Sequence, residues 1–363
     1  MMDLEVDAGR PMDEMVAELC NAPGVPGQEG PVRQIMARLF GPYGTLEQDG
    51  LGNLCCTVHG AEGPRVMLAA HMDEVGFTVS DISDGGFLRF LPLGGWWEQV
   101  MLAQRVTVHT RRGVLQGVVG SKPPHVLPAE KRKEIVNKTD MFVDVGASGR
   151  AEAEDWGVRP GDPVVPVCPF QVLANPRLLM AKAMDDRSGC AVVADVIRQV
   201  AGRSHPNTVL GVATVQEEVG LRGADVAARH LVPDVAFAVD VGIAGDTPGM
   251  ERHEARAVLG GGPMLLVLDS SLVPNPRLRD LVADTAEAEG IPIQWDALAA
   301  GGTDAGRMQF AGSGVPSLVI GLPSRYIHSA ASIVHQDDLE RAAALLAAVI
   351  ARLDYRTVGT LHG

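Results

Sequence analysis

The chain has 363 residues, enough for one large domain or two moderate ones, and its formal net charge of -14 disfavours nucleic acid or an anionic membrane as a partner. Hydrophobic residues make up 46% and aromatic residues only 4%, which predicts a core of aliphatic and alanine side chains. The five cysteines are odd in number and include no CxxC pair, which indicates a reducing, cytoplasmic setting without a disulfide framework.

In chain order, residues 1–7 are acidic and lack the apolar stretch of a secretory signal. Two helices are predicted over residues 12–42, separated by a Pro- and Gly-rich turn at 21–27. Strands are predicted at about 46–59 and 64–71. No uncharged apolar run approaches the length that crosses a membrane.

From residue 75 to 165 the pattern changes. Short β-like stretches separated by Gly-rich turns predict a small β-barrel or sandwich, at residues 76–80, 87–93, 105–110, 114–120 and 141–145. Strand–helix alternation returns after Pro169 and continues to a final helix near 337–354. We therefore expect a mixed-sheet α/β/α catalytic domain, residues 1–74 and 166–363, interrupted by an inserted small β-barrel-like domain, residues 75–165.

The insertion carries a Trp96-Trp97 pair that looks exposed and a Pro123-Pro124 stretch, but none of the candidate ligands described next. Catalysis alone therefore does not explain its presence. We expect it to mediate self-association or to act as a lid over a substrate, and the two roles are compatible.

Acidic and histidine residues follow several apolar runs that are predicted to be buried strands. Loops at strand ends of an open α/β sheet gather at one crevice, so five such residues are expected to converge: His71, Asp185, Glu218, Asp240 and His328. Two imidazoles and three carboxylates suit zinc or a similar dication. Because one open catalytic zinc needs fewer ligands, the set predicts two metal ions that share one carboxylate.

Three neighbouring carboxylates extend this hypothesis. Asp73 lies two positions beyond His71, returns to the same face of an extended segment and can orient the imidazole. Glu217 and Glu218 point in opposite directions on an extended chain, so one can bind metal while the other serves as the general base. Helix capping or a plain turn would explain these residues singly, but explains the whole set less well.

Several strings, in order, resemble the tetrahedral (TET) aminopeptidases, the family that includes glutamyl and deblocking aminopeptidases. The resemblance spans nearly the whole chain and shows no departure at a metal position. The matching strings are residues 71–77, 122–125, 183–189, 215–224, 238–242, 301–306 and 325–329.

The resemblance implies two divalent metal ions per subunit, with zinc favoured and cobalt or manganese compatible. It implies that one ion is held by His71, Asp185 and Asp240. The other ion would be held by Asp185, Glu218 and His328, so that Asp185 bridges the two.

By the same resemblance, Glu217 would be the general base, Asp73 would orient His71, and the Asp185–Asp186 peptide bond would be cis. The implied activity is the removal of N-terminal residues from short peptides with a free N-terminus. The implied assembly is a hollow tetrahedral homododecamer built from dimers, with the insertion mediating contacts.

Other functions are less well supported. Carboxypeptidases and deacylases use the same layout, and an endoglucanase would need a separate carboxylate pair that does not stand out. A catalytically silent scaffold would be expected to lack Glu217. No GxSxG occurs, and residues 253–257 lack the second histidine of HExxH. The preferred first residue of the substrate is left open, and it is expected to depend on side chains around Ser270, Leu272, Asp304 and Gln309.

Overall fold

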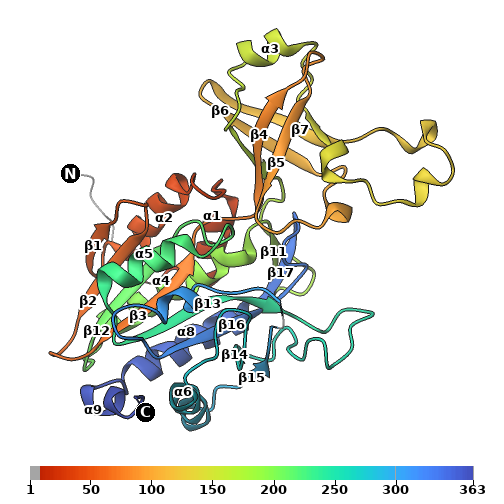
Figure 1. Cartoon of the computed structure of the whole chain (residues 1–363). Helices are drawn as coiled ribbons and strands as arrows, with labels where there is room; N and C mark the ends of the chain where they lie inside the picture. The colour runs from red at the N-terminus through yellow and green to blue at the C-terminus, as the bar shows by residue number, and fades with distance from the viewer. Residues whose placement is uncertain (1–8, 299, 363) are drawn as a thin grey trace.

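The computed structural model describes residues 9–298 and 300–362, and it contains two bodies: a large layered α/β body and a smaller β-barrel joined to one end of it (Figure 1). The fold-class prediction is confirmed. The acidic segment at residues 1–7 lies outside the described residues. None of the described helices is long and apolar enough to span a membrane.

The large sheet is mixed, in the order β1-β2-β12-β3-β13-β16-β17-β11-β10, with β14 and β15 attached beside β16. Its four central neighbours, β12, β3, β13 and β16, run parallel, so their carboxyl ends meet at one edge. The strands are β1 (Thr45–Gln48), β2 (Leu54–His59), β3 (Arg65–His71), β10 (Gln171–Val172), β11 (Leu178–Ala181), β12 (Thr208–Thr214), β13 (Val235–Ile243), β14 (Met264–Leu266), β15 (Gln294–Asp296), β16 (Ser317–Arg325) and β17 (Ser332–His335).

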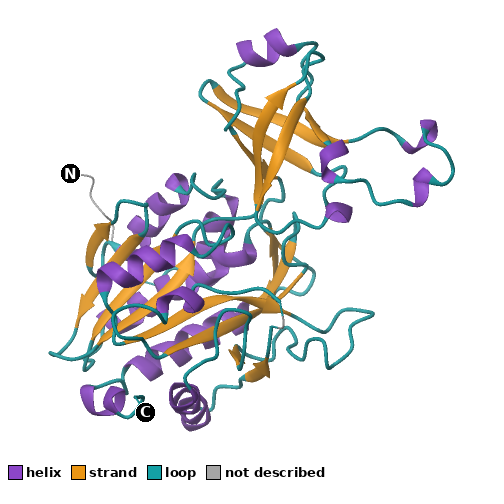
Figure 2. Cartoon of the chain, viewed as in Figure 1, coloured by secondary structure: helices purple, strands orange, loops and turns teal. Residues whose placement is uncertain are grey.

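Helices cover both faces of this sheet, which gives three layers (Figure 2). One face packs against α1 (Met12–Asn21), α2 (Gly30–Phe40), α4 (Met184–Ala201), α6 (Pro276–Glu289) and α8 (Gln336–Ile350). The other face packs against α5 (Arg222–Leu231) and α7 (Ala305–Met308). Both cores consist largely of Val, Leu, Ile, Met and Ala, as the composition predicts.

The inserted body is a closed barrel in the order β4-β5-β8-β7-β6-β9. Its strands are β4 (Gly76–Ile82), β5 (Leu88–Leu93), β6 (Arg105–Thr110), β7 (Gly113–Gly120), β8 (Phe142–Asp144) and β9 (Pro163–Pro166). The short helices in and around it are η1 (Glu98–Val100), η2 (Pro124–Val126), η3 (Lys131–Lys133), η4 (Lys138–Asp140) and α3 (Arg150–Asp155). The sequence did not predict β9, because a proline stands at each end of its four residues, and proline cannot donate a ladder hydrogen bond.

Three local predictions are wrong. Residues 46–59 form two strands, because Asp49 Oδ1 accepts hydrogen bonds from three backbone N–H groups at 51–53 and closes a turn. The final helix ends at Ile350, and Asp354 caps a separate short helix, α9 (Tyr355–Gly359). Trp96 is buried and stacks on Phe77, so of the tryptophan pair only Trp97 is exposed.

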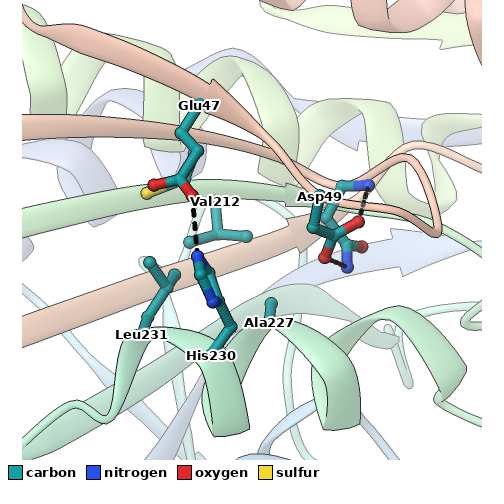
Figure 3. Close-up of a pocket in the computed structure, with 8 residues that line it drawn as sticks. Glu47, Asp49, Val212, Ala227, His230 and Leu231 are labelled. Carbon is teal, nitrogen blue, oxygen red and sulfur yellow. Dashed lines mark hydrogen bonds and ion pairs between the residues drawn. The ribbon is translucent and has the colours of Figure 1, made fainter.

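A small hollow lies between α5 and the edge of the large sheet, and residues of both line it (Figure 3). A ring nitrogen of His230 on α5 lies 2.7 Å from Oε1 of Glu47 on β1, and the apolar side chains of Val212, Ala227 and Leu231 line the same hollow. Both members of this pair are exposed, so the contact adds little stability. The hollow lies outside the converging strand ends that carry the site below.

Candidate metal centre

The structure brings all five predicted ligands together at the carboxyl edge of the parallel strands. His71 is the last residue of β3, and Asp240 lies near the end of β13. Asp185 follows β11 at the start of α4, while Glu218 follows β12 and His328 follows β16. Each side chain reaches the edge because its apolar strand is buried in the sheet, which leaves the next polar residues at the crevice.

Asp185 lies between the two imidazoles. Its Oδ1 is 3.1 Å from Nε2 of His71, and its Oδ2 is 3.3 Å from Nε2 of His328. Oδ1 of Asp240 is 3.9 Å from Nε2 of His71, and Oε2 of Glu218 is 3.4 Å from Nε2 of His328. The five side chains therefore form two groups that meet at one carboxylate.

Glu217 lies beside the first group, with its Oε2 3.9 Å from Nε2 of His71. Asp73 supports both glutamates, since its two carboxylate oxygens accept the backbone N–H groups of Glu217 and Glu218 at 3.0 and 3.1 Å. Nδ1 of His71 is closer to the Asp73 carbonyl oxygen, at 3.0 Å, than to its carboxylate, at 3.6 Å. Asp73 thus holds the turn that carries the glutamates as well as facing the imidazole.

The two adjacent aspartates at the start of α4 have different surroundings. Asp185 faces the cavity, whereas Asp186 accepts hydrogen bonds from the backbone N–H groups of His71 and Gly189 at 3.2 and 3.0 Å. The peptide bond between them is cis, as the resemblance implies. Asp186 therefore supplies the helix-capping role that the sequence offered for one member of the pair.

The chemistry of this donor set fits divalent cations. In two groups of three residues, the nitrogen and oxygen atoms that could bind a metal lie within 4.8 Å of one another. The groups are His71, Asp185 and Glu218, and His71, Glu217 and Asp240. Oε1 of Glu218 is buried without a hydrogen-bond partner among the described residues. A buried carboxylate normally has a partner, so this oxygen has the environment of a metal ligand.

The buried charges repel one another when no cation is bound. Burial, together with the charge of Asp185, raises the pKa of Glu218 to about 8. Burial also raises the pKa of Asp240 to about 8, and Asp185 adds to this effect while the charge of His71 opposes it. Burial lowers the pKa of His328, but Asp185 and Glu218 outweigh it and raise that pKa to about 9. A bound dication would replace these protons.

Metal affinity is therefore expected to rise with pH between about 6 and 8.5. At the lower pH, Glu218 and Asp240 hold protons that a cation must displace, and at the higher pH most of these protons are gone. Isothermal titration of the metal-free protein in buffers of different ionisation enthalpy would measure the released protons. Affinity that is independent of pH would show that these carboxylates are not ligands.

A cavity of about 650 Å³ opens beside the five ligands. Ser270 lines it, as expected, whereas Leu272, Asp304 and Gln309 do not. Asp304 is buried instead and accepts a hydrogen bond from Oγ1 of Thr214 at 2.5 Å. The Gly301–Gly306 motif reaches the cavity through its backbone and Thr303.

The comparisons with known proteins agree with this geometry. Residues 52–345 match the M42 glutamyl aminopeptidase family. The chain belongs to this family. The glutamyl aminopeptidase of Lactococcus lactis subsp. cremoris is 37% identical over 353 residues, covering 96% of this chain and 98% of that protein. M42 peptidases are hydrolases, and the resemblance to TET aminopeptidases is confirmed.

Solved structures of this M42 peptidase's relatives share the whole fold. The TET aminopeptidase from the marine sediment archaeon Thaumarchaeota archaeon SCGC AB-539-E09 superposes with a TM-score of 0.95 at 46% identity, covering 97% of this chain and 99% of that one. The TET1 peptidase of Pyrococcus horikoshii, described as assembling into a tetrahedron or a large octahedral shell, has a TM-score of 0.86 at 32% identity, covering 94% and 100%. The chain is thus an aminopeptidase-family enzyme.

Proposed function

We propose that this M42 peptidase removes N-terminal residues from short peptides at a dinuclear metal centre. One divalent cation would be held by His71, Asp185 and Asp240, and the second by Asp185, Glu218 and His328. The observation that carries the proposal is the position of Asp185, whose two oxygens face the imidazoles of His71 and His328 at 3.1 and 3.3 Å. Zinc fits the mixed nitrogen and oxygen donors best, and cobalt or manganese would also fit.

Two bound divalent cations would supply Lewis-acid polarisation of the scissile carbonyl and would lower the pKa of an attacking water. Glu217 is the carboxylate beside the ligands that is not itself required as one. It takes a proton from the water as the water oxygen attacks the carbonyl carbon, and it returns the proton to the leaving amine as the C–N bond breaks. Burial raises the pKa of Glu217 despite the opposing charge of His71, and a raised pKa favours accepting this proton.

Asp73 supports this chemistry through the backbone of the two glutamates. Its carboxylate fixes the backbone of Glu217 and Glu218, so that the base and the neighbouring ligand keep their separate directions. The free α-amine of the substrate would lie near Asp240, on the side of the site away from Glu218. Binding of that amine would restrict cleavage to the first peptide bond.

The reaction class is tested by comparing leucyl-p-nitroanilide with its N-acetylated form, a peptide blocked at its N-terminus and carboxymethyl cellulose. We expect hydrolysis of the free aminoacyl substrate alone. Release of C-terminal residues from the blocked peptide would indicate a carboxypeptidase. Hydrolysis of cellulose would support the endoglucanase alternative.

We further propose that residues 75–165 form a separate inserted domain within a catalytic domain of residues 1–74 and 166–363, and that the insertion mediates assembly in the cytoplasm. The barrel exposes large apolar side chains, including Leu91, Trp97 and Val114, which a partner subunit would cover. The tetrahedral and octahedral shells described for the TET1 peptidase of Pyrococcus horikoshii support the proposal that the insertion mediates assembly.

Light scattering is expected to give a mass of about twelve chains for the metal-loaded protein, and dimers after metal removal. Leu91→Glu would place a charge on the apolar outer face of the barrel and is expected to reduce the assembly. A stable monomer with full activity would contradict the assembly proposal and leave the metal proposal intact.

A further inference from the structure

The loop that leaves β5 of the barrel reaches the metal centre. Two consecutive glycines in this loop, Gly94 and Gly95, each approach a different proposed ligand of the same metal ion. A Cβ atom added to Gly94 would lie 3.1 Å from Oε2 of Glu218, and one added to Gly95 would lie 3.0 Å from Nδ1 of His328. Most real Cβ atoms have no contact this short, so the backbone approaches the ligands as closely as glycine allows.

The contact at Gly95 also orients the imidazole. Nδ1 of His328 faces the backbone of Gly95, while Nε2 faces Asp185 and Glu218 at 3.3 and 3.4 Å. The barrel loop therefore limits the space in which the ring could turn away from Asp185 and Glu218.

The loop is held firmly at both sides of the glycines. Trp96, next in sequence, is buried, stacks on Phe77 with ring centroids 4.7 Å apart, and donates its Nε1–H to the Gly76 carbonyl oxygen at 3.1 Å. Gly94 has a φ of +86°, and its added Cβ would also lie 2.6 Å from Cγ1 of Val75. The loop can therefore not retreat easily when a side chain is added.

We propose that Gly94 and Gly95 are positioning residues, and that the inserted barrel completes the second metal site by holding Glu218 and His328 in ligand geometry. This inference rests on the proposed ligand roles of those two residues. It assigns the insertion a part in the active site of its own chain, in addition to any part in assembly.

Gly94→Ala and Gly95→Ala test the proposal, with Gly146→Ala as the matched control. Gly146 also lies in the inserted region, has a φ of +83°, close to that of Gly94, and has no heavy atom within 4 Å of an added Cβ. Gly146→Ala therefore reproduces the backbone strain without the contact. Gly95 has no positive φ, so Gly95→Ala tests the contact without the strain.

Zinc bound per chain would be measured by mass spectrometry across a series of zinc buffers, with melting temperature as the check on folding. We expect Gly94→Ala and Gly95→Ala to weaken one of the two zinc equivalents by about 10- to 100-fold, the usual effect of disturbing the groups that support a ligand. Gly146→Ala should keep both equivalents at wild-type affinity, and its melting temperature should show the cost of the backbone strain alone. Unchanged affinity for both equivalents in the two test variants would overturn the inference, whereas fewer than two equivalents in the wild type would overturn the proposed function.

A second observation concerns the substrate. Apart from the five ligands and Glu217, the described residues that line the 650 Å³ cavity carry no charge. The larger uncharged side chains that line it are those of Leu221, Val241, Ile243, Leu298, Thr303 and Ile327. A buried glutamate or lysine side chain would find no uncommitted partner of opposite charge there.

We infer that this chain, although its family is described as glutamyl aminopeptidase, prefers an uncharged first residue, and this inference rests on the proposed function. Leucyl-, glutamyl- and lysyl-p-nitroanilides would be compared by kcat/KM. The leucyl substrate should be faster by about 10-fold or more, because an unpaired charge is rejected strongly. Faster cleavage of the glutamyl or lysyl substrate would overturn this inference alone, and no cleavage of any would overturn the proposed function.

Ile243→Lys adds a test by gain of activity. Ile243 lines the cavity and is 45% exposed, so a lysine can be accommodated there and can pair with a glutamate of the substrate. The ratio of glutamyl to leucyl kcat/KM should rise by about 10-fold. Val273→Lys, at an exposed position that does not line the cavity, should leave the ratio unchanged. An equal rise in both variants would contradict the assignment of the cavity.

Discussion

Replacing Glu217 with glutamine is expected to lower kcat by about 10²- to 10⁴-fold, the usual contribution of a positioned general base, while both metal equivalents stay bound. The amide is nearly the same size and keeps the backbone hydrogen bond to Asp73, but it cannot accept the proton of the attacking water. Steady-state kinetics with leucyl-p-nitroanilide and metal analysis of the same preparation would measure the two effects together.

Glu218→Gln is the matched control, because Glu218 stands next in sequence and its N–H is held by the other oxygen of Asp73. It should weaken one metal equivalent, since it removes the charge of a ligand. If Glu217→Gln loses metal and Glu218→Gln keeps both ions but loses turnover, the two roles are exchanged.

Replacing Glu74 with glutamine is expected to destabilise the fold by about 3–5 kcal/mol, because it leaves two buried cations without their counter-ion. Nζ of Lys182 lies 2.7 and 2.8 Å from the two oxygens of Glu74, and Nη2 of Arg187 lies 3.3 Å from one of them. All three side chains are buried, and burial lowers the pKa of Lys182 despite the charge of Glu74. Urea unfolding would measure the free energy lost.

Glu134→Gln provides the comparison for that variant. Glu134 pairs with Lys131 at 2.9 Å on the exposed loop of the insertion, with both side chains more than half exposed. Removing this pair should change the free energy of unfolding by less than about 1 kcal/mol. Similar losses in the two variants would contradict the role given to the buried cluster.

The buried cluster of Glu74, Lys182 and Arg187 could not be predicted from the sequence. His71, Asp185 and Asp240 could be selected because each follows or ends an apolar run, and strand ends of an α/β sheet meet at one edge. Nothing local pairs Glu74 with Lys182, which lies 108 positions away, or with Arg187, 113 positions away. Such a pairing depends on how the layers pack.

The barrel was predicted as a type of structure but not in its details. Alternating short β stretches identified the barrel. The strand β9 was not predicted, because it has a proline at both ends. The burial of Trp96 was not predicted either, because it depends on stacking against Phe77. The sequence assigns no role to Gly94 and Gly95, because their close approach to Glu218 and His328 can be recognised only in the structure. Only neighbours that are distant in the sequence, Glu218 and His328, give these glycines a role.

Anomalous diffraction at the zinc absorption edge, from crystals of the zinc-loaded enzyme, tests the dinuclear centre most directly. The predicted result is two peaks per chain, one among His71, Asp185 and Asp240 and one among Asp185, Glu218 and His328. A single peak, or a pair of peaks in which Asp185 is not shared, would contradict it.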